Sequence, residues 1–132
     1  MALVSLYLLD TNIIIDIYSA KKSLTFIDKV IRDSQSHLGV SVITVAEFFA
    51  GGSAGEHRQF KQWLSSGELT AYMLDDVEIA VSAGELRKKE GLLFADALIL
   101  AQAIGLKACL VSNDIDFCNK ARRHVKTVNP LA

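Results

Sequence analysis

Residues 91–114 read GLLFADALILAQAIGLKACLVSND, and this stretch decides the fold. From Phe94 to Ile104 apolar side chains occur on nearly every side of a helix, so we predict a helix buried on most sides. After a break at Gly105, residues 108–111 form a fully apolar run of strand length. A buried helix that leads into a buried strand is typical of a parallel sheet with helices on both faces.

The same alternation extends from this stretch to both ends of the chain. We predict strands at residues 5–9, 37–42, 69–74, 108–111 and 125–128, and helices at residues 24–35, 44–50, around 60–64, 77–89, 94–104 and 117–122. In the helix from residue 77, Val77, Ala80, Val81 and Gly84 are predicted to face inward. Because 132 residues suit one domain, we expect a single α/β domain over residues 1–132.

The composition excludes several classes of protein. A hydrophobic fraction of 51% excludes a disordered chain, which could not offset its conformational entropy. With 14 Lys and Arg against 15 Asp and Glu, the net charge is −1, so an anionic partner must be held by a local basic patch. Charged residues interrupt both long apolar stretches, residues 1–20 and 91–111, so we expect neither a signal peptide nor a membrane span.

The two cysteines predict neither a disulfide framework nor a zinc site. Cys109 and Cys118 are separated by eight residues and lack the CxxC spacing of metal sites and redox motifs. Two free thiols are typical of a reducing compartment. We therefore expect a cytoplasmic protein.

Four acids follow different strands or open the helices between them. Asp10 ends the first strand, Glu47 lies early in the helix after the second, Asp96 lies in the first turn of the apolar helix, and Asp114 follows the strand at 108–111. Ligands of such sheets bind beyond the carboxyl ends of the strands, so these side chains are expected to converge there. Clustered carboxylates repel one another unless a cation neutralises them, and Mg²⁺ or Mn²⁺ prefers oxygen ligands. Such a site activates water for phosphodiester hydrolysis.

Each acid also has a purely structural alternative at this stage. The alternatives are a helix cap at Asp10 or Asn12, a capping box from Thr44 to Glu47, a helix-dipole interaction at Asp96, and a turn or cap at Asp114 and Asp116. Four acids at the ends of successive elements make it less plausible that all of them are structural.

Four motifs resemble, in order and spacing, those of PIN-domain ribonucleases, and the closest subgroup is the VapC-like toxins of toxin–antitoxin pairs. The motifs are LLDTNIIID (residues 8–16), SVITVAEFFAG (41–51), FADALILAQA (94–103) and CLVSNDIDF (109–117). The resemblance implies a three-layer α/β/α fold with a central five-stranded parallel sheet. It also implies Mg²⁺ or Mn²⁺, an RNA substrate, a homodimer and a small antitoxin partner. By the same resemblance, Asp10, Asp96 and Asp114 are the expected metal ligands of an endoribonuclease, and Glu47 assists them.

Three further polar residues are expected to assist the acids. Thr11 and Ser112 are placed to orient a carboxylate or a water at the metal, and their alternative role is backbone capping. Ser112 stands where the family often has threonine, and it keeps the hydroxyl. Asp116 lies two residues after Asp114 and is expected to share or take its role.

Basic clusters are the candidates for contact with RNA, because the phosphate backbone needs cations. Arg87 and Lys88 belong to one cluster and Arg122 and Arg123 to another, while solvated helix faces are the alternative explanation. Phe48, Phe49 and Trp63 are expected to lie in the core or an interface rather than stack on bases.

Two other functions compete with a ribonuclease. Residues 51–55, GGSAG, match the G-x-S-x-G pattern of serine hydrolases, but that pattern needs a strand before Ser53, whereas the preceding AEFFA is helical in character. The second alternative is a catalytically silent PIN-like module that binds RNA or protein. The complete set of four acids favours an enzyme over this module.

Overall fold

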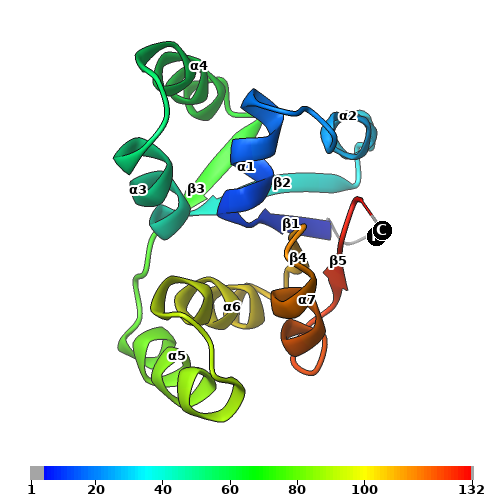
Figure 1. The fold of residues 1–132 in the computed structure, drawn as a ribbon. Helices are drawn as coiled ribbons and strands as arrows, with labels where there is room; N and C mark the ends of the chain where they lie inside the picture. The colour runs from blue at the N-terminus through cyan, green and yellow to red at the C-terminus, as the bar shows by residue number, and fades with distance from the viewer. Residues whose placement is uncertain (1–4, 132) are drawn as a thin grey trace.

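The computed structural model describes residues 5–131 and contains one five-stranded, all-parallel sheet (Figure 1). The strands lie in the order β3-β2-β1-β4-β5. Their bounds are β1 (Ser5–Leu9), β2 (Ser36–Ser41), β3 (Leu69–Tyr72), β4 (Cys109–Val111) and β5 (Thr127–Val128). The predicted α/β fold is therefore confirmed, with β1 in the middle of the sheet. Residues 1–4 and 132, which the single-domain prediction includes, lie outside the described part.

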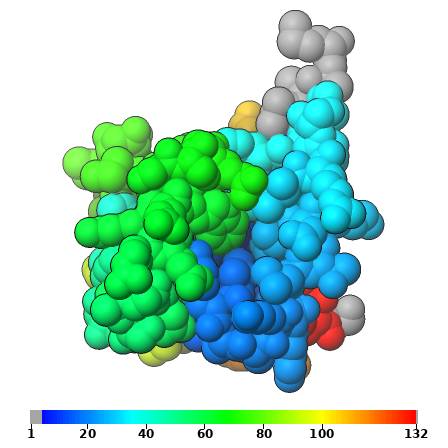
Figure 2. Space-filling view, turned by 90° about the horizontal axis from the view of Figure 1, so that it is seen from above, coloured from blue at the N-terminus to red at the C-terminus, as the bar shows by residue number. Residues whose placement is uncertain are grey.

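Helices cover both faces of the sheet in three layers (Figure 1). One face carries α1 (Thr11–Tyr18), α2 (Leu24–Arg32), α3 (Val42–Ala50) and α4 (Ala54–Ser65), and α1, α2 and α4 dominate the view from above in Figure 2. The other face carries α5 (Val77–Glu90), α6 (Phe94–Leu106) and α7 (Ile115–Ala121).

The alternation of side chains along the central strands divides the core in two. Leu8 packs with α5, α6 and α7, whereas its neighbour Leu9 packs with α1 to α4. Leu110 and Val111 repeat this division on β4. Since successive residues of a strand point to opposite faces, continuous apolar runs are what a sheet covered on both sides requires.

The prediction for α6 is confirmed, because all seven residues from Ala97 to Ala103 are buried. The buried polar residue in this run is Gln102, whose side-chain amide donates hydrogen bonds to the carbonyls of Tyr72 and Met73 at 2.9 and 3.1 Å. This helix therefore fixes the end of β3 as well as filling the core.

The prediction that Val77, Ala80, Val81 and Gly84 form the inward face of α5 is wrong. Val77 is 76% exposed and Val81 is 45% exposed, and Ala80 and Gly84 are also exposed. The helix instead packs inward through a second stripe, which consists of Ile79, Ala83, Leu86 and Glu90. The charge of Glu90 concealed this stripe in the sequence. Arg123 and His124 bind its carboxylate at 2.5 and 2.6 Å, so it is buried as a partnered group.

Several helices begin earlier than predicted, because polar residues at the ends of strands cap them. The hydroxyl of Ser41 accepts a hydrogen bond from the Ile43 amide, so α3 begins at Val42. Asp114 accepts from the Phe117 amide, so α7 begins at Ile115. The connections between strands and helices at this edge of the sheet are therefore very short.

The serine hydrolase alternative is excluded by the position of Ser53. This residue caps α4, and its hydroxyl accepts from the Glu56 amide at 3.2 Å while Glu56 Oε1 accepts from the Ser53 amide at 2.9 Å. The segment before it is α3 rather than a strand. Cys109 and Cys118 are both free and buried. Among the described helices, none has the length and apolar character needed to span a bilayer.

Candidate active site

Asp10 lies at the carboxyl end of the central strand and is 3% exposed. One carboxylate oxygen accepts a hydrogen bond from the Thr11 amide at 2.9 Å. Asp10 therefore caps α1, which is the structural role that its position at the start of a helix predicted. The other oxygen accepts from the Ser112 hydroxyl, also at 2.9 Å. The Asp10 amide donates to the Val111 carbonyl at 2.8 Å and ties this residue to β4. The carboxylate is therefore held from the end of β4 and from the start of α1.

The surroundings of Asp10 disfavour a negative charge. Its pKa is raised from 3.8 to about 7, mainly by burial and to a smaller extent by the charges of Asp96 and Glu47. The hydrogen bonds from Ser112 and Thr11 lower the pKa and only partly offset the effect of burial. A cation beside Asp10 would therefore be strongly favoured at neutral pH.

Asp96 lies in the first turn of α6 and is half-buried. Its pKa is raised from 3.8 to about 6, mainly by burial and then by the charges of Asp114 and Glu47, while Lys120 opposes them. The pKa of Asp96 is thus affected by the charges of Glu47 and Asp114, just as the pKa of Asp10 is affected by the charge of Asp96. The four predicted acids form one electrostatic group, although they come from four different parts of the chain.

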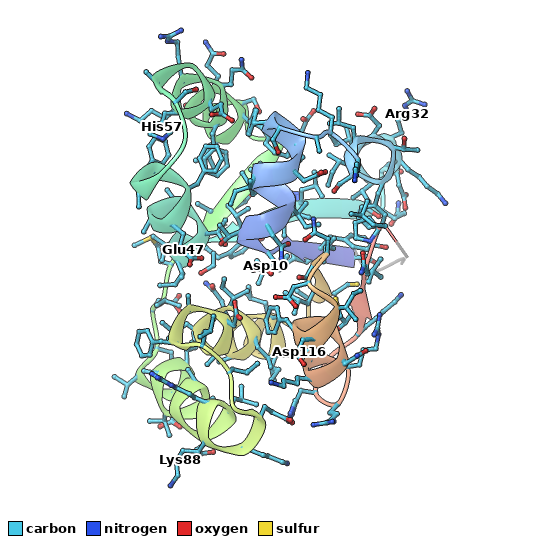
Figure 3. All side chains as sticks on the ribbon, in the orientation of Figure 1. Asp10, Arg32, Glu47, His57, Lys88 and Asp116 are labelled. Carbon is cyan, nitrogen blue, oxygen red and sulfur yellow. The ribbon has the colours of Figure 1, made fainter. Side chains whose placement is uncertain are left out.

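Glu47 is exposed at the edge of this group (Figure 3). Its Oε1 accepts a hydrogen bond from the Thr11 hydroxyl at 2.6 Å, and that hydroxyl lies 3.1 Å from the hydroxyl of Thr44. Because Ser41 is the cap of α3, the capping box from Thr44 to Glu47 is excluded. Glu47 instead turns toward the start of α1, where Asp10 lies.

Asp114 and Asp116 have different surroundings. Asp114 caps α7 and its charge contributes to the raised pKa of Asp96. Asp116 lies two residues further, in the first turn of α7, with its side chain 80% exposed, and its Oδ2 is 3.1 Å from Lys120 Nζ (Figure 3). Of these two acids, Asp114 is the one electrostatically coupled to the other predicted acids.

Ser112 and Asn12 connect the two loops that carry Asp10 and Asp114. The fully buried Ser112 hydroxyl donates to Asp10 and accepts from the Asn12 side chain at 3.3 Å and from the Asp114 amide at 3.1 Å. Asn12 Oδ1 accepts in turn from the Asn113 amide at 3.2 Å. From the sequence, Asn12 was predicted only as a helix cap. Because β1 and β4 are neighbours in the sheet, Asn12 also bridges the loop after β1 and the loop after β4.

The basic residues predicted to contact RNA fall into different environments. Arg123 is bound to Glu90, so its charge is already used within the protein. Arg122 is exposed, and one of its guanidinium nitrogens donates to Asn119 Oδ1 at 3.0 Å. Lys88 lies on the outer edge of α5, far from Asp10 in Figure 3. The guanidinium carbon of Arg87 lies 5.9 Å from the centre of the Phe94 ring.

The donor set suits a hard divalent cation. Between residues 5 and 131, no three acidic, thiol or imidazole side chains are arranged closely enough to enclose a metal ion as they stand. The acids nevertheless share one field, they offer only oxygen donors, and the innermost one carries a raised pKa. Such donors match the preference of Mg²⁺ and Mn²⁺ for oxygen, with water completing the shell.

Comparisons with known proteins agree with this architecture. The sequence model of the PIN domain matches residues 7–123. A toxin-antitoxin complex from Klebsiella pneumoniae superposes with a TM-score of 0.73 at 25% identity, covering 94% of this chain and 97% of that one. VapBC2 from Rickettsia felis, bound to a promoter DNA fragment, superposes with a TM-score of 0.70 at 24% identity, covering 94% of this chain and 98% of that one. VapBC-1 from nontypeable Haemophilus influenzae superposes with a TM-score of 0.73 at 20% identity, covering 96% of this chain and 99% of that one.

None of the curated proteins matches the sequence. The family match covers most of the chain and includes all four acids, and the solved structures share its fold from end to end. The resemblance in the four motifs is thereby confirmed, and the chain belongs to the PIN domain family.

Proposed function

We propose that this PIN domain, spanning residues 1–132, is a metal-dependent endoribonuclease that hydrolyses RNA phosphodiester bonds. The observation that carries the proposal is the position of Asp10. Its carboxylate is buried at the carboxyl end of the central strand, fixed by Ser112 and Thr11, and surrounded by further acids. Burying a charged carboxylate among other acids costs stability unless a cation neutralises it.

In this proposal Asp10, Asp96 and Asp114 hold Mg²⁺ or Mn²⁺. The ion would supply Lewis acidity for the attacking water and for the developing charge on the phosphate. The protein fixes the geometry beforehand. Ser112 and the Thr11 amide hold Asp10 in one orientation, and the Thr11 hydroxyl holds Glu47. Glu47 is exposed and free to accept a proton from a water at the site.

The experiment that tests the proposal is cleavage of total RNA by the purified protein with Mg²⁺, with EDTA and with Asp10→Asn. Asp28→Asn, which changes an exposed acid on α2, is the matched control. We expect cleavage with Mg²⁺ for the wild type and the control only. Metal-independent cleavage would contradict the mechanism. Tight RNA binding without any cleavage would favour the silent PIN-like module.

We further propose that the protein is the toxin of a toxin–antitoxin pair and binds a small antitoxin in the cytoplasm. Support comes from the similarity to toxin-antitoxin and VapBC complexes. The test is induced expression alone and with the product of the neighbouring reading frame. Arrested growth that the second protein relieves is expected, and normal growth in both cases would contradict the toxin role.

A homodimer is the assembly that the exposed face of α5 favours. This face, made of Val77, Ala80, Val81 and Gly84, is apolar and composed of small side chains. Among residues 5–131, a Cβ on Gly84 would meet no atom within 4 Å, so packing there does not require a glycine in mid-helix. Acidic Glu78 lies in the first turn, and Arg87, Lys88 and Lys89 lie in the last. Two antiparallel copies of α5 would therefore pair acidic ends with basic ends across a two-fold axis.

A further inference from the structure

Among the aromatic residues between positions 5 and 131, Phe94 is the one whose side chain is largely exposed. Its exposed fraction is 63%, whereas every other Phe, Tyr and Trp in the described part is buried or half-buried. Phe48, which we expected in the core or an interface, lies in the core, with its ring centre 4.9 Å from that of Phe60. Phe94 is therefore exceptional, although it opens the most deeply buried helix of the protein.

A cation lies over the Phe94 ring. The guanidinium carbon of Arg87, on the last turn of α5, is 5.9 Å from the ring centre. This distance is within the range of a cation–π interaction, which restrains both side chains without burying the ring. Arg87 thus restrains the Phe94 ring, and most of the ring surface remains open to a partner.

Phe94 lies in the same first turn of α6 as Asp96. Phe94 is the first residue of the helix and Asp96 is the third, so they lie about 3 Å apart along the helix axis, with their side chains about 200° apart around it. The four acids repel a phosphate backbone, whereas Arg87 supplies a positive charge at the Phe94 ring. An RNA strand that runs from a phosphate at the acids around the start of α6 would bring a neighbouring base to Phe94.

We propose that Phe94 and Arg87 form a stacking platform for an unpaired base of single-stranded RNA, next to the phosphate that the acids engage. The inference rests on the proposed ribonuclease function, because it assumes that RNA occupies the acidic site. Unpaired bases stack on aromatic rings and on arginine planes, whereas bases inside a duplex are already stacked. The platform therefore selects unpaired regions of RNA and tolerates different bases.

The first test measures, in Mg²⁺, the affinity of a fluorescein-labelled single-stranded RNA hexamer for proteins that all carry Asp10→Asn, including the one with the wild-type Phe94, so that binding is separated from cleavage. Phe94→Ala is expected to weaken binding about 5- to 100-fold, as for other base–aromatic contacts. Phe94→Leu, which keeps apolar bulk without a π face, should weaken it similarly, and Phe94→Trp should retain it. Ile31→Ala, an exposed apolar residue on α2, is the matched control. Equal affinities for the wild type, Phe94→Ala and Phe94→Leu would overturn the platform.

The second test detects stacking directly. The chain has a single tryptophan, Trp63 on α4, whose indole donates to Glu68 at 2.8 Å. In a Trp63→Phe background, Phe94→Trp becomes the sole tryptophan, and the RNA hexamer should quench its emission. The wild type, which reports only on Trp63, should show no quenching. Unchanged emission of the Phe94→Trp protein at saturating RNA would overturn the proposal.

The two proposals fail in different ways. Phe94-dependent binding in the Asp10→Asn proteins, without cleavage by the wild type in Mg²⁺, overturns the ribonuclease and supports the platform. Metal-dependent cleavage with binding that ignores Phe94 supports the ribonuclease and overturns the platform. If Phe94→Ala changes only the oligomeric state measured by sedimentation, the ring serves a protein contact and the platform is overturned as well.

Discussion

The hydroxyl of Ser112 donates a 2.9 Å hydrogen bond to the carboxylate of Asp10, a residue 102 positions earlier in the chain. The parallel register of β1 and β4, which pairs Leu9 with Val111, brings the two residues together just beyond the strands. This bond lowers the pKa of Asp10 against the effect of burial. It therefore favours the ionised form of Asp10, which is the form that can bind a metal.

Ser112→Ala should weaken both the metal affinity and the activity by about 10- to 100-fold, as other losses of a group that orients a ligand do. Without the hydroxyl the pKa of Asp10 rises further, so the acid limb of the pH–rate profile should move to higher pH. Ser112→Thr keeps the hydroxyl and should behave as the wild type. Manganese titration calorimetry and a pH–rate profile measure the two effects. An unshifted acid limb in Ser112→Ala would show that this hydrogen bond does not tune Asp10.

Without metal, the free energy of unfolding should fall between about pH 4 and pH 7. The folded-state pKa of Asp10 is about 7 and that of Asp96 is about 6, both above the ordinary value of 3.8. Over this range the folded state binds more protons than the unfolded state, so stability decreases as the pH rises. The loss from Asp10 alone is on the order of 4 kcal/mol. Urea unfolding in EDTA at several pH values measures it.

The control for this pH effect is Asp10→Asn, which removes the titrating group. Its stability in EDTA should depend much less on pH and should exceed that of the wild type at pH 7. A wild-type stability that stays constant from pH 5 to pH 8 in EDTA would contradict the raised pKa.

Binding of Mn²⁺ should stabilise the wild type by about 2.7 kcal/mol when the free metal reaches 100 times its dissociation constant. Asp114→Asn should reduce this stabilisation, because Asp114 is electrostatically coupled to Asp96. Asp116→Asn should leave it intact, since Asp116 is paired with Lys120. Thermal melts with and without Mn²⁺ compare the two variants. The reverse order of the two variants would assign the fourth acid to Asp116.

Val81→Arg should convert the proposed dimer into a monomer, because it places a charge in the middle of the exposed apolar face of α5. Val81 is 45% exposed, so the substitution should change the stability of one chain by less than about 0.5 kcal/mol. Ile31→Arg, on an exposed position of α2, is the control. Sedimentation velocity measures the mass in each case. Identical masses for the wild type and Val81→Arg would contradict this interface.

Most of the fold was predictable because β1 and β4 are short, mainly apolar runs and α6 is apolar on nearly every side. The inward face of α5 was not, since the helix has two apolar stripes and the buried one ends in Glu90. Its burial depends on Arg123 and His124, which are more than 30 residues away. Likewise, neither the bridging role of Asn12 nor the difference between Asp114 and Asp116 follows from spacing alone. Each depends on the register of β1 and β4 or on the direction of α7.

The central position of β1 has a consequence during synthesis. Strand β1 pairs on one side with β2 and on the other with β4, which is complete only at Val111. A nascent chain that ends before α6 exposes one side of β1 as an unpaired edge and lacks two of the four acids. The complete constellation therefore forms only after synthesis has passed Asp114, and a product terminated before that point carries no assembled site.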